Sequence, residues 1–374
     1  MKSLQKERVF GLDFLRAVAI TLVVVSHATY VLFPETTHAL ITLTRLLGAI
    51  GVDLFFVLSG FLIGRILLKT ILKDKIKLTD LMIFWKRRWL RTLPNYVLIL
   101  LINILLCICL GNSLPEHIAS FFLFLQNFST PHPDFFTEAW SLSIEEFAYV
   151  LVPFFVYITL CFWRKVDRVK LFFWVSLVSI ALLFVLKLQY YFTTEIFSYK
   201  EWSSTFRKVV VYRLDAIYMG FLMVCVVQFK QMLVKRFKTV FMYSGLLIFV
   251  ILHLYVVWCN VLPQTHLWFY VFIYLTGVGV SLVLLMPYFL ELNYIGKGSE
   301  IVTFISKISY SIYLVNYSIV LLTLKHFFEF SEQPFYSRIG LLFMFFGLTV
   351  LLSTLIYSLF ELPILSYRNR KYPS

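Results

Sequence analysis

The chain has 374 residues, of which 60% are hydrophobic and only 14% charged, and its mean hydropathy is +0.84. A soluble domain carries about 25% charged residues, so this composition excludes a soluble globular protein and indicates an integral membrane protein. The net charge of +14 would suit a nucleic-acid-binding protein, but the basic residues follow membrane topology, and we expect no nucleic acid as a partner.

Ten apolar runs of about 20 residues, the length that a helix needs to cross the hydrocarbon core, follow one another along the chain. They are 11–32, 48–68, 94–112, 144–162, 171–190, 212–229, 240–259, 267–287, 308–325 and 339–360. The sequence therefore predicts an all-α integral membrane protein in which residues 1–374 form a single multispanning domain of about ten transmembrane helices. The first run is longer than the apolar part of a signal peptide and contains ionisable residues, so we interpret it as an uncleaved helix.

The basic residues are distributed unevenly between the two sides of these helices. With the N-terminus placed in the cytoplasm, 25 of the 34 Lys and Arg residues fall in inner segments and eight in outer segments or outer helix ends. This asymmetry follows the positive-inside rule, so the N-terminus and the C-terminus are both predicted to be cytoplasmic. The longest inner connection, 69–94, is predicted to run as an amphipathic helix along the inner leaflet, with membrane lipids as partners. The apolar segment His117–Asn127 is too short to span, and we expect it to be interfacial or re-entrant.

Three ionisable residues, Asp13, Arg16 and His27, lie inside the first predicted span, where they are costly and are functional candidates by default. At about 100° per residue, Arg16 and His27 differ by about 1,100°, which is about 20° from a whole number of turns, and Asp13 falls on the same stripe. Arg16 and His27 are separated by about 16 Å along the axis. The stripe indicates a polar lining; the alternative is an Asp13–Arg16 pair beside a histidine that is satisfied by packing.

Acidic residues and a small-residue pair occur in the second and fourth spans. Asp53 lies near the outer end of GVDLFFVLSGFLIG, in which Ser59 and Gly60 permit close helix packing. Glu145 and Glu146 open the fourth span. Because successive helical residues point about 100° apart, at most one of these two faces the same cavity as the first-span histidine.

Seven motifs occur in order over nearly the whole chain. They are LDFLRAVAITLVVVSH, GVDLFFVLSGFLI, FWKRRWLRTLPNY, WSLSIEEFAYVLVP, YRLDAIYMG, ISYSIYLVNYS and FELP. Together they resemble the membrane acyltransferase-3 family, the O-antigen and exopolysaccharide O-acetylase type. The second motif, combined with the spacing from Arg16 to His27, is the most specific part of the match.

The resemblance implies a membrane-bound O-acyltransferase in the inner or plasma membrane of a bacterium. Such an enzyme moves an acyl group, usually acetyl, from cytoplasmic acyl-CoA (acetyl-CoA as co-substrate) to a hydroxyl of a cell-surface glycan or lipid-linked sugar. It also implies that Arg16 and His27 are essential and that Arg88 and Arg91 help to bind the donor, and we expect Arg16 to be the third donor-binding arginine. Arg88 and Arg91 lie on adjoining faces of a helix, from which two guanidiniums can bind phosphate oxygens, and the distance from Arg16 to His27 is comparable to an extended pantetheine arm.

Histidine is the side chain whose unperturbed pKa suits proton abstraction near neutral pH. We therefore expect His27 to be the catalytic base, with Glu145 or Asp53 orienting its ring. The candidates for the substrate side are Trp140, Ser143, Arg213, Asp215 and Asn316. No metal-ligand spacing occurs, so no metal is expected.

The chain departs from the family pattern in the ninth span, where a pattern like YLWHWP is common and Asn316 stands at the histidine position. Asn316 can still hydrogen-bond an acceptor. Family members with a fused extracytoplasmic esterase-like domain are longer, so we expect this chain to act on its acceptor directly or with a separate extracytoplasmic partner.

The alternative function is a multispanning exporter or flippase of a glycan or lipid-linked sugar, because buried charge also marks transport paths. An exporter does not need the Arg88 and Arg91 pair beside a stripe of Arg16 and His27. No repeated half with matching broken helices is visible, which also favours the enzyme.

Overall fold

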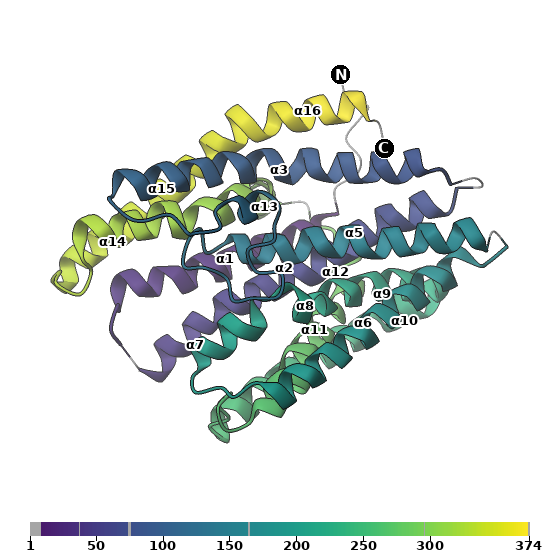
Figure 1. Ribbon diagram of the computed structural model, residues 1–374, viewed down its shortest axis with the longest axis horizontal. Coiled ribbons are helices and arrows are strands. Elements are labelled where there is room, and N and C mark those ends of the chain that lie inside the picture. The colour runs from purple at the N-terminus through teal and green to yellow at the C-terminus, as the bar shows by residue number, and fades with distance from the viewer. Residues whose placement is uncertain (1–8, 37, 74–75, 164, 295, 373–374) are drawn as a thin grey trace.

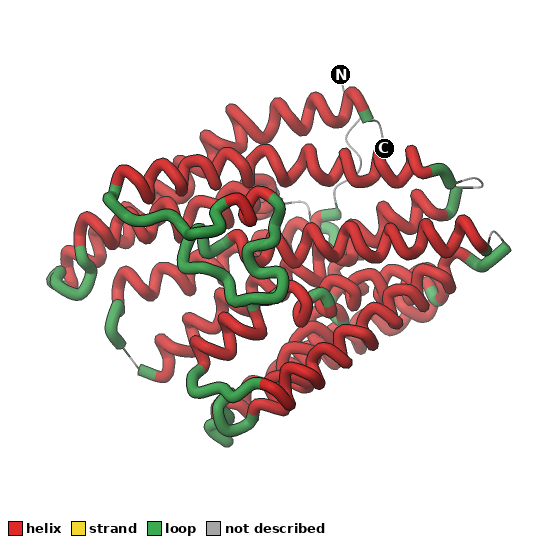
Figure 2. Tube along the Cα trace, in the orientation of Figure 1, coloured by secondary structure: helices red, strands yellow, loops and turns green. Residues whose placement is uncertain are grey.

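The computed structural model describes residues 9–36, 38–73, 76–163, 165–294 and 296–372, and this part of the chain consists of helices and connecting segments without a strand (Figure 1 and Figure 2). In chain order the elements are α1 (Phe10–Leu32), α2 (Ala39–Ile71), α3 (Leu78–Cys109), α4 (Ala119–Phe122), α5 (Ala139–Phe162), α6 (Arg168–Thr193), α7 (Tyr199–Trp202), η1 (Ser203–Arg207), α8 (Val210–Arg213), α9 (Asp215–Phe229), α10 (Gln231–Trp258), η2 (Phe269–Tyr274), α11 (Leu275–Val283), α12 (Met286–Leu290), α13 (Lys297–Val315), η3 (Asn316–Leu321), α14 (Leu322–Phe328), α15 (Phe335–Ile356), η4 (Tyr357–Glu361) and α16 (Leu362–Lys371). The η elements are short π-helical segments, which occur mostly as bulges within α-helices.

Ten helical runs among the described residues are long and apolar enough to cross a membrane. This confirms the predicted all-α, multi-pass membrane protein. The runs differ in how deeply they are buried: 72% of the most apolar window of the α8–α9 run is buried, against 6% for α10. The α8–α9 run therefore lies at the centre of the bundle, and the apolar side chains of α10 face outward, as contact with lipid requires.

Several helices extend beyond their predicted apolar runs. α3 begins at Leu78 and continues through Pro94, so the basic part of segment 69–94 is the first half of the third spanning helix and not a separate surface helix. α13, η3 and α14 likewise form one run from Lys297 to Phe328. The apolar pattern marks only the part of a helix that needs hydrocarbon, whereas Arg, Lys and Glu are good helix formers that continue it.

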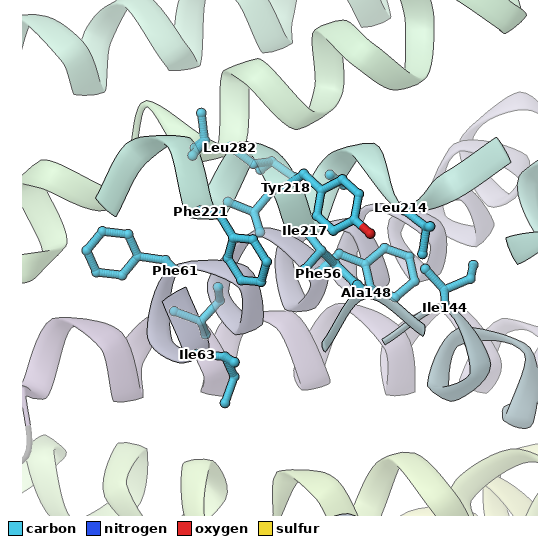
Figure 3. Close-up of a cluster of buried hydrophobic side chains, with 14 of the residues drawn as sticks. Phe56, Phe61, Ile63, Ile144, Ala148, Leu214, Ile217, Tyr218, Phe221 and Leu282 are labelled. Carbon is cyan, nitrogen blue, oxygen red and sulfur yellow. The ribbon is translucent and has the colours of Figure 1, made fainter. Parts of the chain in front are cut away.

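The core lies where α2, α5, α9 and α11 meet (Figure 3). Phe56 and Phe61 of α2 pack there with Ile217 of α9. A Cβ added at Gly60 would lie 2.1 Å from the carbonyl oxygen of Ile217, and one added at Gly220 would lie 2.6 Å from the backbone nitrogen of Phe61. The predicted role of Gly60 in close helix packing is therefore confirmed.

The described chain starts and ends at the same end of the bundle (Figure 1). Val9 lines a groove with Leu68 of α2 and with Leu72, the residue that follows α2, and α16 packs against α3. We call this the terminal end. The far end carries the α1–α2 connection and the segments 110–138 and 194–209.

Which end of the bundle faces the cytoplasm stays a prediction. The inner basic residues used for that prediction include Lys2, Lys6, Arg8, Lys75 and Arg164, which lie outside the described residues.

The segment 110–138 packs over the far end as an ordered connection that contains only the short helix α4 (Figure 2). Phe121 is fully buried, so the apolar part of this segment adds to the core and does not span. Asn127 joins the two long far-end segments: its Nδ2 donates to the carbonyl oxygens of Trp140 at 2.9 Å and Lys208 at 2.6 Å, and its own carbonyl accepts from Val210 N at 2.9 Å. The start of α5 is thereby held against η1 and α8.

Candidate active site

The polar stripe of α1 faces α13 and η3. Near the terminal end, Ser306 of α13 donates to Asp13 Oδ1 at 2.7 Å, and Arg16 Nη1 lies 3.4 Å from both Asp13 Oδ1 and Ser306 Oγ. Towards the far end, His27 meets Asn316 at the first position of η3, with Nδ1 and Oδ1 2.5 Å apart. The three residues that the periodicity placed on one stripe therefore contact one neighbouring helix.

The hydrogen bonds of Asn316 determine the tautomer of His27. Asn316 Nδ2 donates to the carbonyl oxygens of Ile312 at 2.8 Å and Tyr313 at 3.0 Å. Its Oδ1 must therefore face His27, since a flipped amide would oppose its oxygen to two carbonyls. An acceptor opposite Nδ1 requires that Nδ1 carries a hydrogen, so in the neutral ring the lone pair lies on Nε2. The ring also packs on Tyr317, with centroids 4.7 Å apart.

Glu138, which sequence reasoning missed, holds the backbone around Asn316. It is 3% exposed, and its Oε1 accepts from the backbone N–H groups of Tyr317 at 3.2 Å and Ser318 at 2.7 Å. Its Oε2 accepts from the hydroxyl of Ser318. Glu138 therefore satisfies donors that the change from α13 to η3 exposes, and burial raises the pKa of its carboxyl to about 7. The only signal in the sequence is an acid two residues before the WSLSIEE motif.

A cavity of about 90 Å³ runs between α1, α2, α3, α5 and α13. Its lining includes the three predicted donor-binding arginines, Arg16, Arg88 and Arg91, together with Glu145. At its other side lie Ser141 and Tyr313, whose hydroxyl oxygens are 2.7 Å apart. Tyr313 is less than one helical turn before Asn316. The cavity therefore leads from the arginines at the terminal end towards the neighbourhood of His27.

The two glutamates at the start of the fourth span face different partners. Glu145 forms an ion pair with Arg88, whose guanidinium also lies 4.4 Å over the ring of Tyr149. Glu146 accepts from Thr92 at 3.0 Å. Glu145 is the one that lines the cavity, and it contacts the donor-side arginine and not His27.

Asp53 belongs to a buried ion-pair network. Arg213, which has no exposed surface, pairs with Asp53 and lies 3.3 Å from Asp215, and Lys187 lies 2.6 Å from the other oxygen of Asp215. The network joins α2, α6, α8 and α9 and balances two positive with two negative charges. Asp53, Arg213 and Asp215 are thus brought together, but the described contacts of His27 include neither Asp53 nor Glu145.

The remaining substrate-side candidates are part of the packing. Trp140 is 4% exposed and packs edge-on against Phe56 with centroids 5.8 Å apart. Ser143 is fully buried, accepts from Gln126 at 2.7 Å and lies 3.3 Å from the carbonyl oxygen of Ala139. Of the five candidates, only Asn316 contacts His27.

Comparison with known proteins identifies the family. The family described as acyltransferase domain (Acyl_transf_3) matches residues 9–358, which contain every element from α1 to α15. The chain belongs to the acyltransferase-3 family. The polar stripe of α1, the cavity and the His27–Asn316 contact all lie inside the matched region, so the site described above is a site of this family's domain.

Two of the known proteins that the chain matches are named as O-acetyltransferases. O-acetyltransferase OatA of Staphylococcus aureus (strain NCTC 8325 / PS 47) is 30% identical over 197 residues, which is 47% of this chain and 29% of the relative. Peptidoglycan O-acetyltransferase OatA of Listeria monocytogenes is 34% identical over 130 residues, which is 30% of this chain and 20% of the relative. The matched part is thus less than a third of the length of either relative. No solved structure matches the chain.

Proposed function

We propose that this member of the acyltransferase-3 family transfers an acetyl group from acetyl-CoA to a hydroxyl of a glycan or lipid-linked sugar. The observation that carries the proposal is the His27–Asn316 pair, because it presents a neutral imidazole with a free Nε2 at one end of a polar path. The family and the names of the two relatives, one of them a peptidoglycan O-acetyltransferase, support acetyl as the group and a glycan as the acceptor.

In the proposed reaction His27 acts first as a base and then as an acid. Nε2 accepts the proton of the acceptor hydroxyl while that oxygen attacks the thioester carbonyl. The tetrahedral intermediate collapses with loss of the coenzyme A thiolate, and the proton on Nε2 passes to the sulfur. An ester and a free thiol result, and His27 returns to its neutral form. Asn316 accepts from Nδ1 throughout, so it orients the ring in place of the carboxylates that we expected from the sequence.

The donor is proposed to bind at the terminal end. Arg16, Arg88 and Arg91 line one cavity there, and guanidiniums bind phosphate oxygens with charge-assisted hydrogen bonds. Arg16 and His27 are about 16 Å apart along α1, which suits a pantetheine arm between phosphates at the rim and a thioester near His27. In this proposal the nucleotide stays at the rim of the bundle beside the arginines, and the pantetheine arm enters the cavity.

The test of this function is direct acetyl transfer by the purified full chain in detergent. The protein is incubated with radiolabelled acetyl-CoA and peptidoglycan glycan strands, and label that mild base releases from the glycan is counted as O-acetyl ester. We expect ester formation that needs both substrates and intact protein. Hydrolysis of acetyl-CoA without ester formation on this glycan or on polyprenyl-linked sugars would contradict the proposal.

A further inference from the structure

The short segment after η1 brings a lysine within electrostatic range of His27 from outside the stripe of α1. The ammonium of Lys208 acts electrostatically on His27, His132 and Glu138. Its backbone is fixed, because its carbonyl accepts from Asn127 and the next residue, Val209, is fully buried. Lys208 is therefore placed at the far-end side of the candidate active site, where an acceptor would approach His27.

Arg207 adds a second positive charge at the same place. Its guanidinium carbon lies 5.0 Å over the ring of Trp140, and its Nε donates to Ser203 at 3.1 Å. Within the part of the chain that the structure describes, no carboxylate lies within 4.0 Å of the charged nitrogens of either Arg207 or Lys208. The two neighbouring cations are thus held by an aromatic ring, a hydroxyl and the backbone.

The buried acidic side chains near Lys208 already have other partners. Asp53 and Asp215 are paired with Arg213 and Lys187, and Glu138 accepts from the backbone of η3. Asp134 is exposed. A net positive charge therefore remains beside His27 at the far end, and partly buried charge of this kind is costly unless an opposite charge meets it.

We propose that Lys208, with Arg207 beside it, binds an anionic group of the acyl acceptor and so sets the acceptor hydroxyl against His27. This inference rests on the proposed acetyl transfer. The group is a carboxylate or a phosphate, as in a glycan that bears acid groups or a sugar linked to a polyprenyl diphosphate. Lys208 is accordingly a residue that determines acceptor specificity.

The charge on Lys208 gives the proposal a second readout. Burial, followed by the neighbouring Arg207, lowers its pKa to about 8, with Lys200 acting in the same direction and Asp134 and Glu138 opposing it. Lysine is charged below its pKa, so anion binding is present below about pH 8 and is lost as the pH rises through that value. The charged and titratable groups that act on Lys208 are Arg207, Lys200, Asp134 and Glu138, and Lys208 in turn acts on His27 and His132.

The experiment compares acceptors that differ only in charge, using the full chain. One pair is a peptidoglycan glycan strand and the same strand with its lactyl carboxyls converted to methylamides. The second pair is a polyprenyl diphosphate-linked disaccharide and the alkyl glycoside of that disaccharide. The variants are Lys208→Gln, Lys208→Arg and, as a control with the same loss of charge at an exposed position of the same far-end segment, Lys200→Gln.

For at least one pair we expect Lys208→Gln to raise KM for the anionic member about tenfold to a hundredfold, the effect of one hydrogen bond to a charged group. KM for the neutral member should stay within about twofold, Lys208→Arg should restore binding, and Lys200→Gln should behave like the parent. The pair that responds identifies the carboxylate or the phosphate as the ligand. In the parent, KM for that anionic acceptor should rise above about pH 8.

Two results would overturn this inference while leaving acetyl transfer intact. One is a parent enzyme that uses the charged and neutral members of both pairs equally well. The other is a Lys208→Gln variant that loses kcat on neutral and anionic acceptors alike, since this would make Lys208 a structural or catalytic group. Absence of transfer to all four acceptors would instead refute the proposed function.

Discussion

Asn316 contacts the ring of His27 at the position where the sequence analysis expected Glu145 or Asp53. It holds the ring of His27 through Oδ1 while its Nδ2 is fixed by two carbonyls of α13. The neutral amide accepts from Nδ1, so in the proposed reaction the protonated ring would be less stabilised than it would be beside a carboxylate. A ring oriented in this way returns its proton readily to the leaving thiolate.

Asn316→Ala should lower kcat about fivefold to a hundredfold, the effect of about 1–3 kcal/mol for an orienting hydrogen bond, with little change in KM for the donor. Steady-state acetyl transfer measures both constants. Asn103→Ala is the matched control, because Asn103 is also a buried asparagine whose Nδ2 donates to the carbonyl four residues back, at 2.9 Å. Equal effects on kcat for the two variants would show that Asn316 serves packing only.

Glu138→Gln should also act through Asn316. The substitution keeps one acceptor oxygen but places an amide N–H near the donors of Tyr317 and Ser318, which should shift the first turn of η3. We expect a lower kcat with an unchanged KM for the donor, and a loss of about 1–3 kcal/mol in stability. The measurement is kcat together with thermal unfolding in detergent. If Glu138→Asp restores kcat while its stability stays reduced, Glu138 positions Asn316. If Glu138→Gln is destabilised but keeps its kcat, this role is contradicted.

The sequence identified the residues of the α1 stripe but not their partners. Periodicity alone placed Asp13, Arg16 and His27 on one face, because that depends only on local helix geometry. The partners Ser306 and Asn316 are nearly 300 positions away, and which helix packs against α1 is decided by the whole bundle. Glu138 was not predicted from the sequence for the same reason, because its role depends on the backbone N–H groups of a helix that is distant along the chain.

At the scale of elements, α3 carries the donor-side arginines on one continuous helix. Arg88 is tied to Glu145 and Tyr149. Arg91 lines the same cavity, is more exposed than Arg88 and acts electrostatically on Glu361. Removing Arg88 would therefore leave Glu145 without its ion-pair partner and would affect folding as well as binding. Arg91 offers the cleaner test of donor recognition.

Arg91→Ala should weaken acetyl-CoA binding by about 1.5–3 kcal/mol, the value of one charge-assisted contact, and the unfolding temperature measured beside it shows how much of the change is structural. Isothermal titration of detergent-purified protein measures the affinity. Lys86→Ala removes the same charge from an exposed position on the same helix that does not line the cavity and should bind the donor like the parent. If both variants bind equally well, the arginines of α3 serve topology or lipid contact.

Element boundaries were less predictable than element number. All ten spans were expected from apolar runs, but the helices continue into basic segments such as 78–93 of α3 because hydropathy does not report helix ends. The ion pairs of Asp53, Arg213 and Asp215 could not be predicted from the sequence either. Buried charge was visible in the motifs, yet its pairing across α2, α6, α8 and α9 required the packed structure.

For the whole molecule, the positive-inside asymmetry predicts that the terminal end is cytoplasmic. Reporter fusions after Lys170 and Lys238, at the terminal end, should read cytoplasmic, and fusions near Pro133 and Glu201, at the far end, should read external. A reversed result at two or more of these sites would place the arginine-lined cavity away from cytoplasmic acyl-CoA. The two pairs of fusion positions lie at opposite ends of the bundle, so the reporters decide which end faces the cytoplasm.

The central claim is that His27 transfers a proton in acetyl transfer across the bundle, from a donor at the terminal end to an acceptor at the far end. The most direct measurement uses sealed proteoliposomes with radiolabelled acetyl-CoA enclosed and glycan strands outside, for the parent and for His27→Gln. Gln keeps the size and hydrogen bonding of His but does not take the proton. We predict labelled ester on the outer glycan for the parent, a loss of about 10²–10⁴-fold for His27→Gln, and equal acetyl-CoA binding and unfolding temperature for both proteins. Near-parental labelling by a stable His27→Gln protein, or transfer by the parent only when donor and acceptor share one side, would contradict the claim.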